Sequence, residues 1–123
     1  MTVTTATTYV PARFGDPTTL TTTPINVYTF DQISILKQLL VANIFNGLLT
    51  FSLYLVPAGQ VLKEKYKIFG DVQVDANTVL TIDLNQVTYP GETIYASANV
   101  ANGLNFILSG VEIFNPPIVE AHI

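Results

Sequence analysis

The side chains that could carry out acid–base or nucleophilic chemistry are few in this chain, and they do not group into a site. The one histidine, His122, is next to the last residue, where chain ends are ordinarily mobile. A serine hydrolase would need it beside a serine held in a sharp Gly-x-Ser-x-Gly turn. The four serines, at positions 34, 52, 97 and 109, instead lie within predicted strands. We therefore expect no catalytic residue and no enzyme activity.

The carboxylates and the metal-binding residue types add little. Asp71, Asp75 and Asp83 form the densest acidic group, and their spacing alone leaves open a glycosidase pair, which would have to meet at roughly 5 to 10 Å across a cleft. Asp75 and Asn77 lack the remainder of a calcium-loop pattern, so turn residues are the simpler interpretation. Cysteine is absent, which removes thiolate metal ligands. We expect no metal and no cofactor.

The composition points to a protein whose surface is covered by neighbours. Charged residues make up 11% of the chain and hydrophobic residues 49%, whereas a typical soluble domain has about 25% charged residues. Unusually many neutral polar residues would also explain this, but we favour apolar surface buried between subunits of a homo-oligomer. The net charge is −4, so nucleic acid is not an expected partner. The five basic residues are Arg13, Lys37, Lys63, Lys65 and Lys67.

Two groups of surface residues are candidates for interaction. Lys63, Lys65 and Lys67 are the one dense cluster of charge, and they either contact an acidic neighbour or protect an edge strand from unwanted pairing. Tyr54 and Tyr95 fall on positions predicted to face outward. Such rings bind sugars or protein partners, or they are half-buried strand residues whose hydroxyls reach water.

The N-terminal residues 1–24 differ in kind from the rest. Ten of the first 23 residues are threonine, and prolines stand at positions 11, 17 and 24. β-Branched threonine favours extended backbone and proline interrupts a strand ladder, so we predict an extended arm outside the core that pairs little along its length. Its removal is expected to leave a folded core. A disordered tail is the alternative. The residues expected to anchor the arm on a neighbour are Tyr9, Arg13, Phe14 and Leu20.

The body, residues 25–114, is predicted to be a set of strands. Residues 33–44 are apolar and fit either a short helix or a strand, and we choose the strand. Residues 48–56 alternate apolar and polar side chains, which indicates a strand. The uncharged stretch 38–62 is long enough to cross a bilayer, but this alternation argues against a membrane span. Asn46-Gly47 is typical of a tight turn between two paired strands.

The C-terminal half contains the clearest strand signals. Residues 94–98 and 104–108 carry apolar side chains at alternate positions around Asn102-Gly103, which predicts a β-hairpin. The apolar phase then shifts across Gly110, as a bulge would cause. Residues 89–92, Tyr-Pro-Gly-Glu, suit a type II turn, and residues 115–123 form a short tail. Together these patterns predict an all-β domain, an antiparallel β-sandwich or a jelly-roll-like barrel.

Several of these segments resemble small virion proteins of tailed bacteriophages. The resembling residues are Val56-Pro-Ala-Gly59, then Leu80-Thr-Ile-Asp-Leu84, then Tyr89-Pro-Gly-Glu-Thr-Ile-Tyr-Ala-Ser-Ala98, and finally Asn105-Phe-Ile-Leu-Ser-Gly-Val-Glu-Ile113. The resemblance spans about residues 33–114. Glu92 stands where that family usually has aspartate, and the threonine-rich arm is not part of the shared pattern.

The resemblance implies a β-sandwich located in the virion and assembled in the cytoplasm of a bacterial host. We expect a capsid decoration or cement protein that sits on the head lattice as a homo-oligomer, with a trimer favoured, and contacts the major capsid protein or other virion proteins. The alternative is a neck or tail component. A carbohydrate-binding module that uses Tyr54 or Tyr95 is a third interpretation. No membrane and no nucleic acid are expected as partners.

Overall fold

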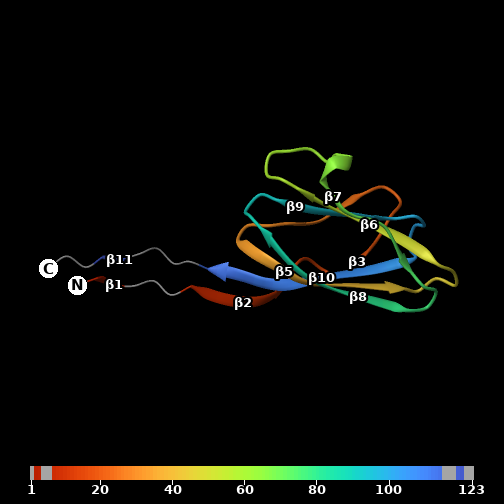
Figure 1. The fold of residues 1–123 in the computed structure, drawn as a ribbon, viewed down its shortest axis with the longest axis horizontal. Coiled ribbons are helices and arrows are strands. Elements are labelled where there is room, and N and C mark those ends of the chain that lie inside the picture. Colours follow the sequence, from red (N-terminus) through yellow and green to blue (C-terminus); the bar gives the residue numbers. More distant parts are fainter. Residues whose placement is uncertain (1, 4–6, 115–118, 121–123) are drawn as a thin grey trace.

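Two antiparallel β-sheets pack face to face in the computed structural model, which describes residues 2–3, 7–114 and 119–120 (Figure 1). The described part of the chain contains no helix long and apolar enough to cross a membrane. In chain order the elements are β1 (Thr2–Val3), β2 (Thr8–Arg13), β3 (Thr18–Thr19), β4 (Ile25–Thr29), β5 (Ile33–Asn43), β6 (Leu49–Val56), the 3₁₀ helix η1 (Glu64–Tyr66), β7 (Lys67–Val74), β8 (Val79–Thr88), β9 (Thr93–Ala98), β10 (Leu104–Phe114) and β11 (Val119–Glu120).

The order of the strands is that of a jelly roll. The β10 sheet has the order β2-β10-β5-β8, and the short β3 continues along the same edge of β10 as β2. The β9 sheet has the order β4-β9-β6-β7. From β3 to β10, only the β6–β7 connection stays within one sheet. Eight antiparallel strand positions connected in this way form the two Greek keys of a jelly roll, so the predicted all-β sandwich is confirmed.

The core lies between the two sheets and consists of alternate side chains from both. Leu39 and Phe106 project from the β10 sheet, and Leu53 and Ile94 project from the β9 sheet, all essentially without exposure to solvent. Because side chains of a strand alternate between its two faces, the residues between these positions must lie on the outer faces of the sandwich. The described side chains leave no buried polar atom without a hydrogen-bond partner.

The predicted β-hairpins are wrong, although the strands that would have formed them exist. β9 pairs with β4 and β6, whereas β10 pairs with β2, β3 and β5. Residues 94–98 and 104–108 therefore face each other across the core, and the turn at Asn102-Gly103 carries the chain from one sheet to the other. Asn46-Gly47 does the same between β5 and β6. In this arrangement each strand still has antiparallel partners, and the apolar faces of both strands are buried against each other, at about 25 cal/mol per Å² of apolar surface.

The local predictions hold better. Residues 33–43 form a strand, not a helix, and the uncharged stretch 38–62 contains the end of β5 and all of β6. The Tyr89 carbonyl accepts a hydrogen bond from the Glu92 amide at 3.1 Å, and Gly91 has φ +89°, as a type II turn requires. The register of β10 against β5 does shift between Ser109 and Gly110, but the extra residue is Lys37 of β5, and β2 pairs with β10 without interruption. β10 therefore keeps its alternation, and the predicted phase shift at Gly110 is wrong: Val111 stays on the same face as Ile107.

The boundary predicted between arm and body is wrong for residues 8–24. This segment is extended, as expected, but β2 pairs with β10 along its whole length, including Pro11 opposite Val111. Pro11 is tolerated because β2 is an edge strand. Phe14 and Leu20 are buried in the core, where the Phe14 ring contacts Phe30 at a centroid distance of 5.2 Å. Removal of residues 1–24 would therefore open the core instead of leaving it intact.

Replacing Phe14 by alanine tests whether this side chain belongs to the core. We expect Phe14→Ala to lower the free energy of unfolding by about 3–5 kcal/mol, because a fully buried aromatic side chain is removed. Tyr9→Ala is the matched control in the same segment, since the Tyr9 side chain is 63% exposed, and it is expected to change stability little. Urea unfolding followed by far-UV circular dichroism measures both. Equal effects of the two substitutions would contradict a core role for Phe14.

Candidate functional site

The outer face of the β10 sheet is unusually apolar. The cross-strand register aligns Pro11, Val111, Ile35 and Val87 in one row that crosses all four strands. A neighbouring row holds Tyr9, Ile113 and Ile33. Nearer the other end of the strands, Ile107 lies beside Leu40, and Ala42 beside Val79. The apolar outer face is therefore formed by Tyr9, Pro11, Ile33, Ile35, Leu40, Ala42, Val79, Val87, Ile107, Val111 and Ile113.

Polar side chains divide the apolar outer face, among them Lys37, whose ammonium donates to the Asn85 side-chain oxygen at 2.5 Å. Arg13, Ser109, Gln38 and Asp83 align across the four strands. The Arg13 guanidinium lies 4.0 Å from the exposed Asp16 carboxylate, an exposed pair of little energetic value. The predicted interaction residues Tyr9 and Arg13 thus come together on one surface. Charge placed within an apolar contact region fixes the orientation of a partner more than it adds affinity.

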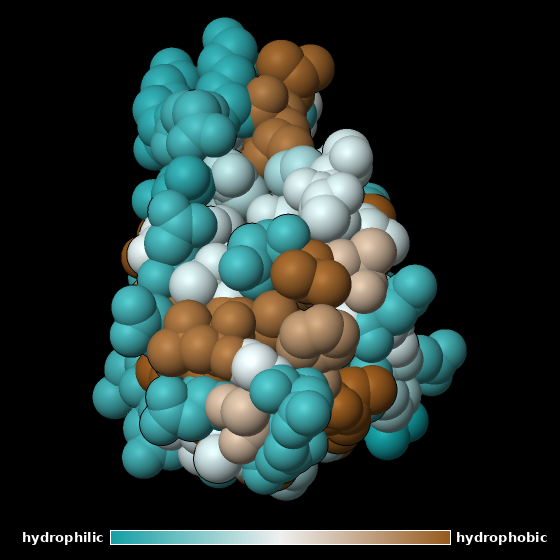
Figure 2. All heavy atoms as spheres, turned by 90° about the vertical axis from the view of Figure 1, so that its right-hand side faces the viewer, coloured by the Kyte–Doolittle hydropathy of each residue, from teal (hydrophilic) through white to brown (hydrophobic). Residues whose placement is uncertain are grey.

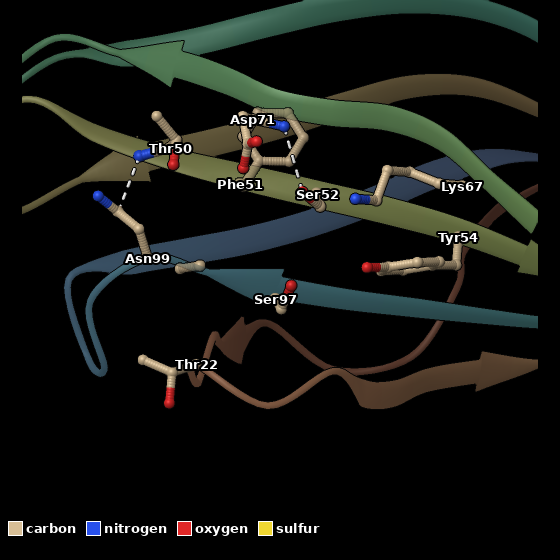
Figure 3. Close-up of a pocket in the computed structure, with 10 residues that line it drawn as sticks. Thr22, Thr50, Phe51, Ser52, Tyr54, Lys67, Asp71, Ser97 and Asn99 are labelled. Atoms are coloured by element: carbon tan, nitrogen blue, oxygen red, sulfur yellow. Dashed lines mark hydrogen bonds between the residues drawn. The ribbon is translucent and has the colours of Figure 1, made fainter. Parts of the chain in front are cut away.

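The outer face of the β9 sheet is polar by contrast. Its corresponding row is Asn26, Tyr95, Tyr54 and Lys67. A hollow of about 210 Å³ opens on this face, and Figure 3 shows the hydroxyl, amide and charged groups around it. The Thr50 amide donates to the Asn99 side-chain oxygen at 2.9 Å, and the Asp71 amide donates to the Ser52 hydroxyl at 3.1 Å. The hollow is therefore lined by polar groups that are partly occupied with one another.

Tyr54 does not offer the exposed ring that was predicted. Its side chain is 5% exposed, and the Lys67 ammonium lies 5.5 Å from the ring centroid (Figure 3). Lys67 in turn forms an ion pair with Glu64 at 2.9 Å. A sugar ring needs an accessible aromatic face for stacking, so the prediction that Tyr54 is a surface interaction residue is wrong. The sequence pattern placed Tyr54 on the outer face correctly but could not show what covers it.

The lysine cluster divides between two environments. Lys63 and Lys65 are exposed, and Lys65 lies over the ring of Tyr66 at 5.2 Å. Lys67 begins β7, which is an edge strand of the β9 sheet. The hydrogen bond from Lys67, followed by its positive charge, holds the pKa of the Glu64 carboxyl below its ordinary value. The same hydrogen bond raises the pKa of the Lys67 ammonium. These contacts agree with protection of an edge and do not test the alternative of an acidic partner.

A second apolar surface lies at the end of the sandwich opposite β2. Figure 2 looks onto this end and shows hydrophobic side chains gathered there. Its exposed apolar residues are contributed by the β5–β6 loop and the start of β8, and we call them the apolar tip: Ile44, Phe45, Leu48 and Val79. This surface was not among those predicted from the sequence. Its signal was the position of apolar residues directly on both sides of the Asn46-Gly47 turn, where polar residues are usual.

The buried Asn43 side chain holds the apolar tip in place. Its amide nitrogen donates to the carbonyls of Gly47 and Val74, each at 2.9 Å, and its oxygen accepts from the Phe45 amide at 2.8 Å. Main-chain hydrogen bonds from Ile44 to Gly103 and from Asn77 to Phe45 tie the neighbouring loops to it. One side chain thus satisfies three main-chain groups at the base of the loop.

The role of Asn43 is tested by shortening it. Asn43→Ala is expected to lower the free energy of unfolding by about 1–3 kcal/mol, because main-chain groups at a buried position lose their partners. Asn46→Ala, in the exposed part of the same loop, is the control and is expected to have a much smaller effect. Thermal unfolding measures both. A normal stability of Asn43→Ala would show that water replaces the asparagine at no cost.

The Lys67–Glu64 pair gives a prediction that depends on pH. Because the pKa of Glu64 is lowered in the folded state, the stabilisation from the ion pair is fully present above the ordinary carboxyl pKa of 4.5. This stabilisation is lost as the pH falls through the lowered pKa. In Lys67→Met the pKa of Glu64 is expected to rise toward 4.5, as measured by NMR titration of the carboxyl carbon. Lys65→Met is the control and should leave this pKa unchanged. An unaltered pKa in Lys67→Met would exclude the pair in solution.

The remaining predicted interaction residues do not reach a surface. Phe14 and Leu20 are core residues, so neither is available to anchor a partner. Among the described residues, no group of three or more histidine, cysteine or acidic side chains is arranged as a metal site. His122 and most of the predicted tail 115–123 lie outside the described residues, and the backbone of β11 within that tail pairs with β1.

Comparisons with known proteins identified no relative of this chain. No family model, no curated protein and no solved structure matches the chain.

Proposed function

We propose that this protein is a structural component of a tailed-bacteriophage virion, a decoration or cement protein whose apolar outer face binds a neighbouring protein of the particle. The partner is the major capsid protein or another virion protein, and the protein acts as a homo-oligomer. Its role is to add contact area between subunits, with no chemical transformation.

The observation that carries this proposal is the row formed by Pro11, Val111, Ile35 and Val87 on the outside of a sheet. In an antiparallel sandwich the outer positions are ordinarily polar, as they are on the β9 sheet of this same molecule. Contiguous exposed apolar surface marks protein contacts. Burial of such surface contributes about 25 cal/mol per Å² before the costs of association, and repetition over a particle multiplies a modest contact.

Two further considerations support a virion component. The sequence resemblance to phage virion proteins covers the strands from β5 to β10. The jelly roll recurs in viral capsid proteins but also in lectins and cupins. The fold therefore supports a virion protein only by analogy, and the main support is the apolar outer face. The buried Tyr54 ring weighs against a carbohydrate-binding module. A neck or tail component remains the alternative, because the apolar outer face would serve equally well there.

Counting copies in purified particles separates these alternatives. Quantitative mass spectrometry of phage particles that encode the chain is expected to find hundreds of copies for a head protein, and a dozen or fewer for a neck or tail component. Absence from the particles would refute both.

The role of the apolar outer face is tested by rebinding to particles of a phage from which the gene is deleted. The double variant Ile35→Asn with Val111→Asn is expected to lose binding by at least tenfold, because polar side chains interrupt the apolar row. The matched control is Thr93→Asn with Ser97→Asn on the β9 sheet, which is expected to bind normally. Circular dichroism establishes that both variants are folded. Undiminished binding of the first variant would contradict the role of the apolar outer face in binding.

A further inference from the structure

The four edges of the two sheets differ in how well they are protected against pairing with another strand. β2 carries Pro11, β4 is five residues long with a register shift, and β7 is irregular around Asp71, which has φ +48°. Proline, shortness and bulges are the usual devices that block an edge. β8 is the least protected: it runs for ten residues without proline or lysine, and Asp83 is its one charged residue. Its one irregularity is a register shift against β5 between Asp83 and Gln86. In the described part of the chain it pairs with β5 alone.

The hydrogen bonds of β8 indicate which of its main-chain groups face outward. The Asn43 amide donates to the Thr78 carbonyl at 2.8 Å, and this pair continues directly into the β5–β8 register. In an antiparallel ladder the residues that bond inward alternate with residues whose amide and carbonyl point away. Leu80 and Ile82 therefore bond to β5. Leu84 packs against the core and Thr88 is buried, so the even positions keep this phase across the register shift, and the odd-numbered residues from Val79 to Val87 present their main-chain groups at the open edge.

We infer that β8 is a self-pairing edge, which joins the β10 sheets of two copies of this chain into one continuous sheet about a two-fold axis. The occupant of the edge is a second β8, aligned antiparallel. This inference does not depend on the proposed function, since it concerns the purified protein.

The sequence of β8 selects the register of this pairing. Opposite residues must face the same side of the sheet, so odd positions pair with odd ones. A register with Asp83 opposite Asp83 would place like charges together, which is destabilising. Shifting by one step puts Leu84 on the axis, Asp83 opposite Asn85 and Thr81 opposite Val87. This register overlaps nearly the whole strand, whereas the opposite shift, with Ile82 on the axis, overlaps less of it.

In the register centred on Leu84, the outward groups of Thr81, Asp83, Asn85 and Val87 all find partners. Residues in a hydrogen-bonded antiparallel pair exchange two bonds, so the contact supplies about eight main-chain hydrogen bonds. The Asp83 carboxylate also meets the partner's amide side chain. A contact between two strands buries less than the roughly 1,200 Å² of a standard interface, so we expect a reversible dimer whose population rises with concentration.

The first experiment removes one outward donor. Multi-angle light scattering and sedimentation equilibrium of the purified chain should give a mass that rises with concentration toward twice 13.4 kDa. Thr81→Pro is expected to raise the dissociation constant at least about tenfold, because it loses an outward amide on both copies and leaves the β5 ladder intact. Thr81→Ala keeps the amide and is the matched control, expected to dimerise normally.

The second experiment tests the register and does not require a proline. Asn85→Asp places a carboxylate opposite Asp83 on both sides of the axis, so it should weaken the dimer several-fold at low salt and less at high salt. Asn46→Asp adds the same charge in an exposed loop and should leave the dimer unchanged. Amide exchange of Thr81 and Asn85 should slow as concentration rises. A monomer at millimolar concentration, or a dimer unaffected by both Thr81→Pro and Asn85→Asp, would overturn the inference.

Discussion

The contact between the inner faces of the two sheets is the interaction on which the rest of this molecule depends. Phe106 and Leu39 from one sheet meet Leu53 and Ile94 from the other in a core with essentially no solvent exposure. Because the chain crosses between the sheets at almost every connection, each sheet is assembled from segments that are distant in sequence. The N-terminal segment belongs to this core through Phe14, which is why it cannot be separated from the domain.

The packing of the inner faces also determines which residues lie on the outer faces. Alternation places about every second residue of β5 and β10 outside, and in these two central strands many of the outside residues are apolar as well. Strands covered on both faces show nearly continuous hydrophobic sequence, and β5, with the sequence Ile-Ser-Ile-Leu-Lys-Gln-Leu-Leu-Val-Ala-Asn, fits that description. Under the proposed function a neighbouring protein would cover this sheet on its outer side, which would also account for the low charge of the chain.

The two proposed contacts between molecules involve the same sheet but would not compete for the same groups. The apolar outer face would use side chains of all four strands of the sheet, whereas the β8 edge would use main-chain groups in the plane of the sheet. A particle component that joins its copies edge to edge would present a doubled apolar face to the surface beneath it. The polar β9 sheet would then face away from that surface, with the ion pair of Lys67 and Glu64 at its edge.

The sequence by itself determined local features such as the alternation that makes residues 49–56 a strand and the turn at Gly91. Each depends on a few neighbouring residues, so composition and spacing sufficed. Only the tertiary structure decided the pairing partners, because the loop at Asn102-Gly103 has the local chemistry of a hairpin turn yet connects two sheets. The same holds for burial. Phe14 lies among threonines and prolines that suggest an exposed arm, and Tyr54 occupies an outward position that Lys67 covers. Contacts between residues distant in sequence settle both cases, and no local pattern records them.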